Sequence, residues 1–221
     1  MPDAPRQKTF LLARPEARVL EWIARRLPAR VLPDHLTLLA LAASGGIAVA
    51  YALAGHGPGW LIAACGLLVI HWLGDSLDGT LARVRKIERP TYGYYVDHLA
   101  DAVATAAIGI GLGLSPYLDL ATGLLLVVAY LVLSINTYLE THAFGVFSLG
   151  YGRVGPTEAR LALIALTALL ALGAPLPLDA LVIGAVAVML AGLAIRAGKN
   201  LKALAAREPA GVARAPVAAA P

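Results

Sequence analysis

Apolar residues divide the chain into six long segments, which short turns rich in glycine and proline separate. Runs of about 20 apolar residues exceed what a soluble core needs, and they match the length of a helix that crosses a bilayer. The pattern therefore predicts an all-α membrane protein with six transmembrane helices. The six segments run at about 36–54, 59–82, 93–114, 118–142, 157–173 and 179–198.

Lysine and arginine are distributed asymmetrically between these segments. Of the 18 basic residues, seven precede the first segment, four lie in 83–89, two in 153–160, and five from 196 onward, so that the other three turns hold none. Basic residues accumulate on the cytoplasmic side of membrane proteins. We therefore expect both termini in the cytoplasm and the protein in the bacterial inner (cytoplasmic) membrane, with a mean hydropathy of +0.73 that fits this location.

The regions outside the six segments differ in character. Residues 16–28 alternate apolar and basic residues at helical spacing, which predicts an amphipathic helix on the cytoplasmic leaflet or, as the alternative, an ordinary soluble cap. Residues 1–14 and the Ala/Pro-rich tail at 201–221 are predicted to be disordered. The membrane domain would then occupy 15–200.

Four aspartates stand inside two of these apolar segments. Asp75 and Asp78 lie one helical turn apart on the second segment, and Asp97 and Asp101 lie one turn apart on the third. A short turn makes the two segments antiparallel neighbours. At 1.5 Å per residue, Asp75 and Asp101 lie about 12 Å inward and the other pair about half as deep, so we expect the four carboxylates to converge.

Such a cluster requires a compensating cation. An Asp at the centre of a membrane helix costs roughly 2.5–3.5 kcal/mol, and mutual repulsion adds to this cost. A site made only of carboxylate oxygens suits Mg²⁺ or Mn²⁺, and four aspartates are enough to hold two ions that clamp a phosphoryl group. Gly79 has no side chain on the same face, and Arg83, one turn further, could hold a diphosphate.

The spacing of these residues resembles the signature of the CDP-alcohol phosphotransferases. The matching string is Asp75-x2-Asp78-Gly79-x2-Ala82-Arg83-x9-Gly93-x3-Asp97-x3-Asp101. The stretch 33–37 before the first segment is also similar to this family, except that Asp34 stands where many relatives have Asn.

This resemblance implies an enzyme that moves the phosphoalcohol part of a CDP-alcohol to an acceptor alcohol and releases CMP. The four aspartates would hold the metals, and Asp101 would also accept the proton of the attacking hydroxyl. The donor nucleotide would be bordered by Gly79, Ala82, Arg83 and Thr37.

The acceptor is less well defined by the sequence. Glu140 and His142 are polar residues near the end of the fourth segment, where interhelical hydrogen bonding is the alternative to a functional role. Arg153 and Arg160 could meet an anionic acceptor, or could simply follow the distribution of basic residues. We expect CDP-diacylglycerol as the donor, together with membrane lipids, a homodimer and no nucleic-acid partner.

Three alternatives to this assignment remain at this level. The string Glu140-x-His142-x2-Gly145, followed by Gly155-Pro156-Thr157-Glu158, is similar to the choline and ethanolamine phosphotransferase branch, which argues for a CDP-headgroup donor and a lipid acceptor. A divalent-cation transporter would need acidic groups along a path to the far side, where these segments are apolar. An intramembrane prenyltransferase would carry its Asp-rich motifs on well-separated helices.

Overall fold

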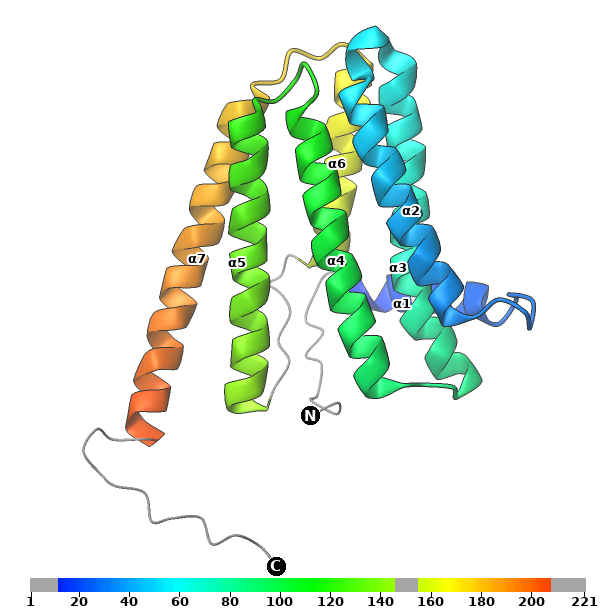
Figure 1. Ribbon diagram of the computed structural model, residues 1–221, viewed down its shortest axis with the longest axis vertical. Coiled ribbons are helices and arrows are strands. Elements are labelled where there is room, and N and C mark those ends of the chain that lie inside the picture. Colours follow the sequence, from blue (N-terminus) through cyan, green and yellow to red (C-terminus); the bar gives the residue numbers. More distant parts are fainter. Residues whose placement is uncertain (1–11, 146–154, 208–221) are drawn as a thin grey trace, which may run out of the picture.

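The computed structural model describes residues 12–145 and 155–207, which form α-helices and one short 3-10 helix and, over these ranges, no strand (Figure 1). The elements are α1 (Ala13–Ala24), α2 (Pro33–Ala52), η1 (Ala54–His56), α3 (Pro58–Arg85), α4 (Pro90–Gly113), α5 (Leu120–Phe144), α6 (Pro156–Ala171) and α7 (Leu178–Arg207).

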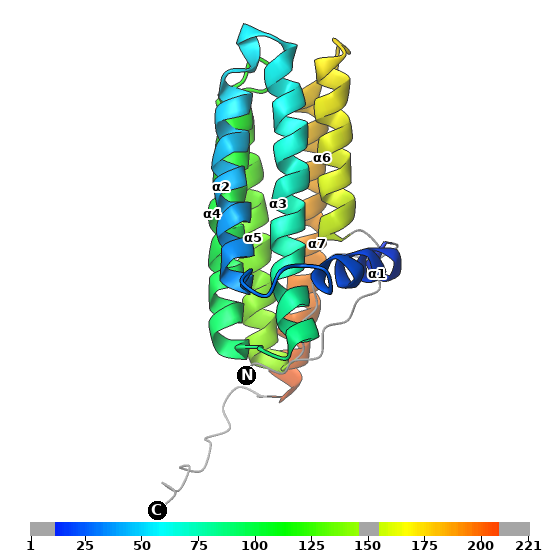
Figure 2. The same ribbon diagram turned by 90° about the vertical axis from the view of Figure 1, so that its right-hand side faces the viewer.

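The helices α2 to α7 run side by side as a bundle, and α1 crosses α3 beneath the first turn of α6, toward one end of the bundle (Figure 2). We call this end the basic end, because basic residues of α1, of the turn between α3 and α4 and of the last turn of α7 lie there. In the bundle α2 packs against α3 and α4, α4 against α5, α5 against α7, and α3 against α6. The short helix α1 packs against α3.

Within residues 12–145 and 155–207, five helices are long and apolar enough to cross a membrane, namely α2, α3, α4, α5 and α7. This confirms an all-α integral membrane protein, although the predicted count of six transmembrane helices is not exact. The helix at the predicted span 157–173 is α6, which has 16 residues and reaches about 24 Å, short of the roughly 30 Å of a hydrocarbon core. Its length is limited by Pro156 at its first position and by Gly173, whose φ of 78° ends the helix.

The helices α3 and α4 are antiparallel, as predicted, but within the described residues they are not one of the closely packed pairs. Both pack against α2, which approaches each of them at a glycine. A Cβ on Gly74 of α3 would lie 2.7 Å from the carbonyl oxygen of Leu36, and one on Gly111 of α4 would lie 2.4 Å from Cα of Ala48. The wider spacing between α3 and α4 leaves room for polar side chains between them.

Helix α1 corresponds to the predicted amphipathic helix. Its residues Leu20 and Ala24 are buried against Leu77 and Leu81 of α3, whereas Trp22 remains 57% exposed. One side of α1 is therefore part of the protein interior.

The ends of the chain agree only in part with the predicted boundaries. Helix α7 continues to Arg207 and so extends into the stretch 201–221 that we assigned to a disordered tail. The rest of that tail and residues 1–11 lie outside the described residues.

Candidate active site

Three of the four aspartates meet between α3 and α4. One carboxylate oxygen from each of Asp75, Asp97 and Asp101 lies within 4.8 Å of the other two, and all three residues are half-buried. Asp75 comes from α3, whereas Asp97 and Asp101 stand one turn apart on α4. The site therefore combines the two carboxylate-bearing faces that the sequence predicts.

Asp78 lies beside this group with partners of its own. Its Oδ2 accepts a hydrogen bond of 2.6 Å from the hydroxyl of Thr37 on α2, and its Oδ1 accepts one of 2.5 Å from the backbone N–H of Gly79. Asp78 also interacts electrostatically with Asp97 and Asp75. Three of the four predicted carboxylates therefore meet within 4.8 Å, and Thr37 of α2 holds the fourth, that of Asp78, next to them.

A basic side chain from a distant part of the chain reaches the carboxylate group. Arg160, in the second turn of α6, donates from Nη2 to Oδ2 of Asp75 at 2.5 Å, and each side chain is about one-fifth exposed, at 20% and 19%. Arg160 also interacts electrostatically with Asp101. Of the four acceptor-site candidates, Arg160 is therefore the one that the described residues place at the carboxylates.

The predicted nucleotide residues of α3 lie one turn nearer the basic end. The guanidinium of Arg83 donates to Oγ1 of Thr80 at 3.0 Å, and its Nη1 would lie 3.3 Å from a Cβ placed on Gly79. The Arg83 side chain therefore folds back over the bare backbone of Gly79, and Ala82 lies half-buried next to it on α3.

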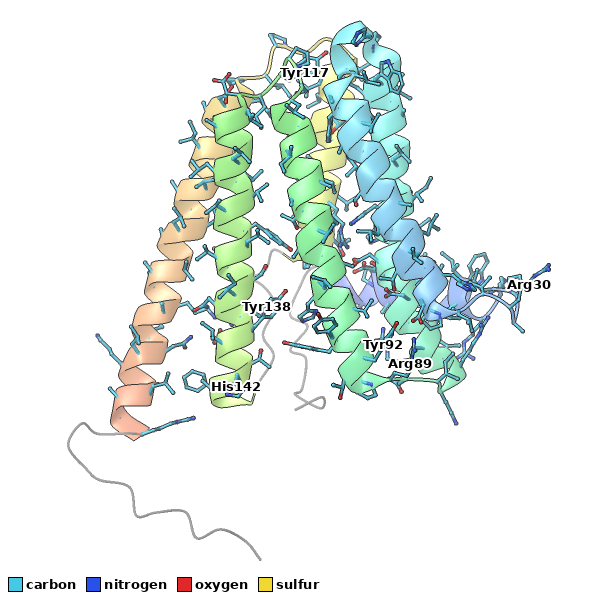
Figure 3. The ribbon with its side chains drawn as sticks, in the orientation of Figure 1. Arg30, Arg89, Tyr92, Tyr117, Tyr138 and His142 are labelled. Carbon is cyan, nitrogen blue, oxygen red and sulfur yellow. The ribbon has the colours of Figure 1, made fainter. Side chains whose placement is uncertain are left out.

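The other acceptor candidates are placed differently. Glu140 on α5 forms a 2.6 Å ion pair with Arg196 of α7, and both side chains are only 16% exposed. His142 is exposed in the last turn of α5, at the basic end of the bundle (Figure 3). Arg153 lies outside the described residues. The contacts of Glu140 thus join α5 to α7, and do not connect it to the carboxylate group.

An aromatic stack next to Asp97 was not foreseen from the sequence. The ring of His98 on α4 lies 4.1 Å from that of Tyr94 and 4.8 Å from that of Tyr138 on α5, measured between centroids. Nδ1 of His98 is 3.3 Å from Oδ2 of Asp97, and Figure 3 shows Tyr138 on the side of α5 that faces α4. The spacing of Tyr94 and His98, four residues apart on one helix face, is a signal that could have identified half of this stack.

The composition of the carboxylate group fits a hard divalent cation. Its three candidate ligands are all oxygen atoms, and Mg²⁺, Mn²⁺ and Ca²⁺ prefer such ligands to nitrogen or sulfur. Oxygens at 2.0–2.6 Å from one ion lie at most about 5 Å apart, so the observed separations are compatible with a shared ion.

Comparison with known proteins agrees with this chemistry. The family model described as CDP-alcohol phosphatidyltransferase matches residues 30–196, which is more than half of the 221-residue chain. No curated protein matches the chain. The matched stretch includes α2 to α6 and most of α7, and with them all four aspartates. The chain therefore belongs to the CDP-alcohol phosphatidyltransferase family and is a membrane phosphotransferase of phospholipid synthesis.

Proposed function

We propose that this enzyme transfers a phosphatidyl group from CDP-diacylglycerol to an acceptor alcohol, with release of CMP. The observation that carries the proposal is the meeting of Asp75, Asp97 and Asp101 within 4.8 Å inside a membrane bundle. Carboxylates at this spacing repel one another strongly unless cations compensate them. Such an arrangement suits chemistry on a diphosphate.

Two divalent cations, Mg²⁺ or Mn²⁺, would be held by Asp75, Asp78, Asp97 and Asp101. Cations bound there would offset the charge of the diphosphate and of the phosphoryl group in transfer. Asp78 takes part through the lone pairs that remain after it accepts hydrogen bonds from Thr37 and Gly79. Thr37 would in this way orient Asp78 as well as border the nucleotide.

Asp101 is proposed as the catalytic base. It stands on α4 in the interior of the bundle, where it would take the proton of the acceptor hydroxyl as that oxygen attacks the phosphorus atom. A base must lie within hydrogen-bond reach of the proton that it accepts. The half-buried position of Asp101 limits competition from water.

The donor nucleotide would lie along Gly79, Ala82 and Arg83. The bare backbone of Gly79 permits close approach of a phosphate, and the guanidinium of Arg83 that covers it would donate to the diphosphate oxygens. The nucleotide would then lie nearer the basic end than the carboxylates do.

The acceptor side is proposed to include Arg160, which would orient the acceptor from its position at Asp75. Glu140, His142 and Arg153 remain weaker candidates. By the positive-inside argument, the basic end would face the cytoplasm of the bacterial inner membrane. We also propose a homodimer, which cross-linking in native membranes would test.

A second candidate donor is CDP-choline or CDP-ethanolamine, with a lipid as acceptor. The sequence around Glu140 and His142 favours it. A structural observation favours it as well, since Arg160, the basic side chain at the carboxylates, is paired with Asp75. A phosphorylated acceptor would have to compete with Asp75 for this guanidinium group.

The decisive experiment measures CMP release by the purified protein in lipid nanodiscs. CDP-diacylglycerol would be offered with free and phosphorylated alcohols, and CDP-choline and CDP-ethanolamine with diacylglycerol, each with Mg²⁺ or Mn²⁺. We expect release with CDP-diacylglycerol that stops with EDTA and returns when metal is restored. Consumption of only the CDP-headgroup donors would reverse the order of the candidates, and full turnover by metal-stripped protein would contradict the metal assignment.

A further inference from the structure

One carboxylate of α1 holds two other helices together. Oε1 of Glu16 accepts a hydrogen bond of 3.0 Å from the indole Nε1 of Trp72 on α3 and one of 2.8 Å from the hydroxyl of Thr157 on α6. All of these atoms are partly buried. Glu16 therefore forms a junction of α1 with the middle of α3 and the first turn of α6.

A second carboxylate, on α6, also connects α6 to α1. Glu158 of α6 accepts a 3.0 Å hydrogen bond from the backbone N–H of Leu12, just before α1. Its other oxygen accepts one of 3.0 Å from the N–H of Gly155, which caps α6. The first turns of α1 and α6 are thus joined by reciprocal carboxylate contacts, which gives the Gly155-to-Glu158 string a structural role.

This junction lies one helical turn from the site. Trp72 precedes Asp75 by three residues on α3, and Thr157 precedes Arg160 by three residues on α6. Residues three apart share a helix face and are separated by about 4.5 Å along the axis. The two helix segments that Glu16 joins are therefore the segments whose Asp75 and Arg160 form the 2.5 Å ion pair.

Helix α6 depends on such a polar contact more than its neighbours do. It has only 16 residues, and its main packing partner is α3. Within a bilayer, packing and polar contacts hold helices together, because the hydrophobic effect does not favour association there. At its far end α6 is fastened by the 2.7 Å hydrogen bond between Tyr51 and Thr167, so Glu16 is the corresponding contact at the basic end.

We propose that Glu16 is a positioning residue, through which α1 holds α6 against α3 so that Arg160 remains at Asp75. Helix α1 would then contribute to the reaction through the position of Arg160. The effect on catalysis rests on the proposed function, whereas the effect on α6 does not.

Three substitutions on α1 distinguish the positioning role of Glu16 from a role of α1 in membrane attachment alone. Glu16→Ala removes both hydrogen bonds, and since small misplacements of reacting groups can cost up to about 10²-fold, we expect turnover to fall roughly tenfold or more. Glu16→Gln keeps one amide oxygen that can accept from both donors, and should retain most activity. Glu21→Ala, an exposed residue of the same helix paired with Arg25, should have no effect.

A double-mutant cycle tests whether Glu16 acts through Arg160. In an Arg160→Ala background, adding Glu16→Ala should lower turnover little further, and the affinity for the CDP-donor should stay unchanged in both variants. Additive losses would overturn the proposal, as would a normal rate in Glu16→Ala. If Glu16→Ala does not fold, Thr157→Val and Trp72→Phe each remove one of the two hydrogen bonds and are subject to the same cycle.

Hydrogen exchange followed by mass spectrometry gives a readout that needs no turnover. We expect faster exchange in the first turns of α6 in Glu16→Ala than in wild type or Glu21→Ala. Unchanged exchange would overturn the proposal even if turnover fell. If the wild type consumed no CDP-alcohol, the proposed function would fail, and the exchange experiment would still decide whether Glu16 holds α6.

Discussion

Replacing Gly111 by alanine tests the contact that sets the distance between α2 and α4. The new Cβ would lie 2.4 Å from Cα of Ala48 and 2.7 Å from its carbonyl oxygen. Both atoms belong to the backbone and cannot rotate away. The two helices must therefore separate by about 1 Å to restore ordinary van der Waals contact.

The expected magnitude combines two opposing contributions. Overpacking of this kind costs roughly 1–3 kcal/mol, and replacement of glycine by alanine inside a helix returns about 0.5–1 kcal/mol. The net loss in the free energy of unfolding is about 0–2.5 kcal/mol. Its central value of about 1 kcal/mol corresponds to a fall in melting temperature of roughly 2–4 °C. Turnover should also fall, because α2 carries Thr37 and α4 carries Asp97 and Asp101.

Gly66→Ala on α3 is the matched control. A Cβ at Gly66 would contact nothing within 4 Å, so only the gain in helix propensity remains, and its melting temperature should equal or exceed that of wild type. Tryptophan fluorescence during heating in detergent would compare the two variants, which differ from wild type by the same methyl group. Equal melting of Gly111→Ala and Gly66→Ala would refute the close approach of α2 and α4.

Further substitutions separate the roles of neighbouring residues. Asp101→Asn keeps an oxygen but removes the base, so donor binding should persist while CMP release falls roughly 10²–10⁴-fold. Asp78→Asn should weaken metal-dependent donor binding as well as CMP release. An equal loss of donor binding in the two variants would make Asp101 chiefly a metal ligand. Arg83→Ala should weaken donor binding roughly tenfold or more, on the scale of charge-assisted hydrogen bonds, with little change in melting temperature. Arg85→Ala should leave donor binding nearly unchanged and lower the melting temperature by roughly 2–8 °C. The reason is that the Arg85 guanidinium donates to four carbonyls of the connection between α1 and α2. An unchanged melting temperature would refute that role. These four acceptors are the carbonyls of Leu27, Pro28, Ala29 and Val31.

Much of this protein is determined by the sequence alone. A bilayer leaves no water to satisfy backbone groups, so apolar runs of about 20 residues must be helices, and their positions could be read directly. Helical periodicity also placed Asp75 and Asp78 on one face and Asp97 and Asp101 on another. The family signature is local in sequence, which is why the reaction class could be predicted before any contact was known.

Packing between helices decided which of these polar faces meet. The sequence predicted that four carboxylates converge. In the structure three of them meet within 4.8 Å, and Thr37 of α2, which packs against both α3 and α4, holds Asp78 beside them. The pairing of Arg160 with Asp75 joins residues 85 positions apart. Periodicity states which face of a helix is polar, but not which other helix that face meets.

Two carboxylates have partners that helical periodicity could not predict. Glu140 was an acceptor-site candidate, and its ion pair with Arg196 exists only because α7 packs on α5. The sequence presents Glu16 as one polar residue of an amphipathic helix, and only the packing of α1 against α3 and the first turn of α6 reveals its two hydrogen bonds. A buried carboxylate takes the donor that three-dimensional packing brings to it, and that donor can come from any part of the chain.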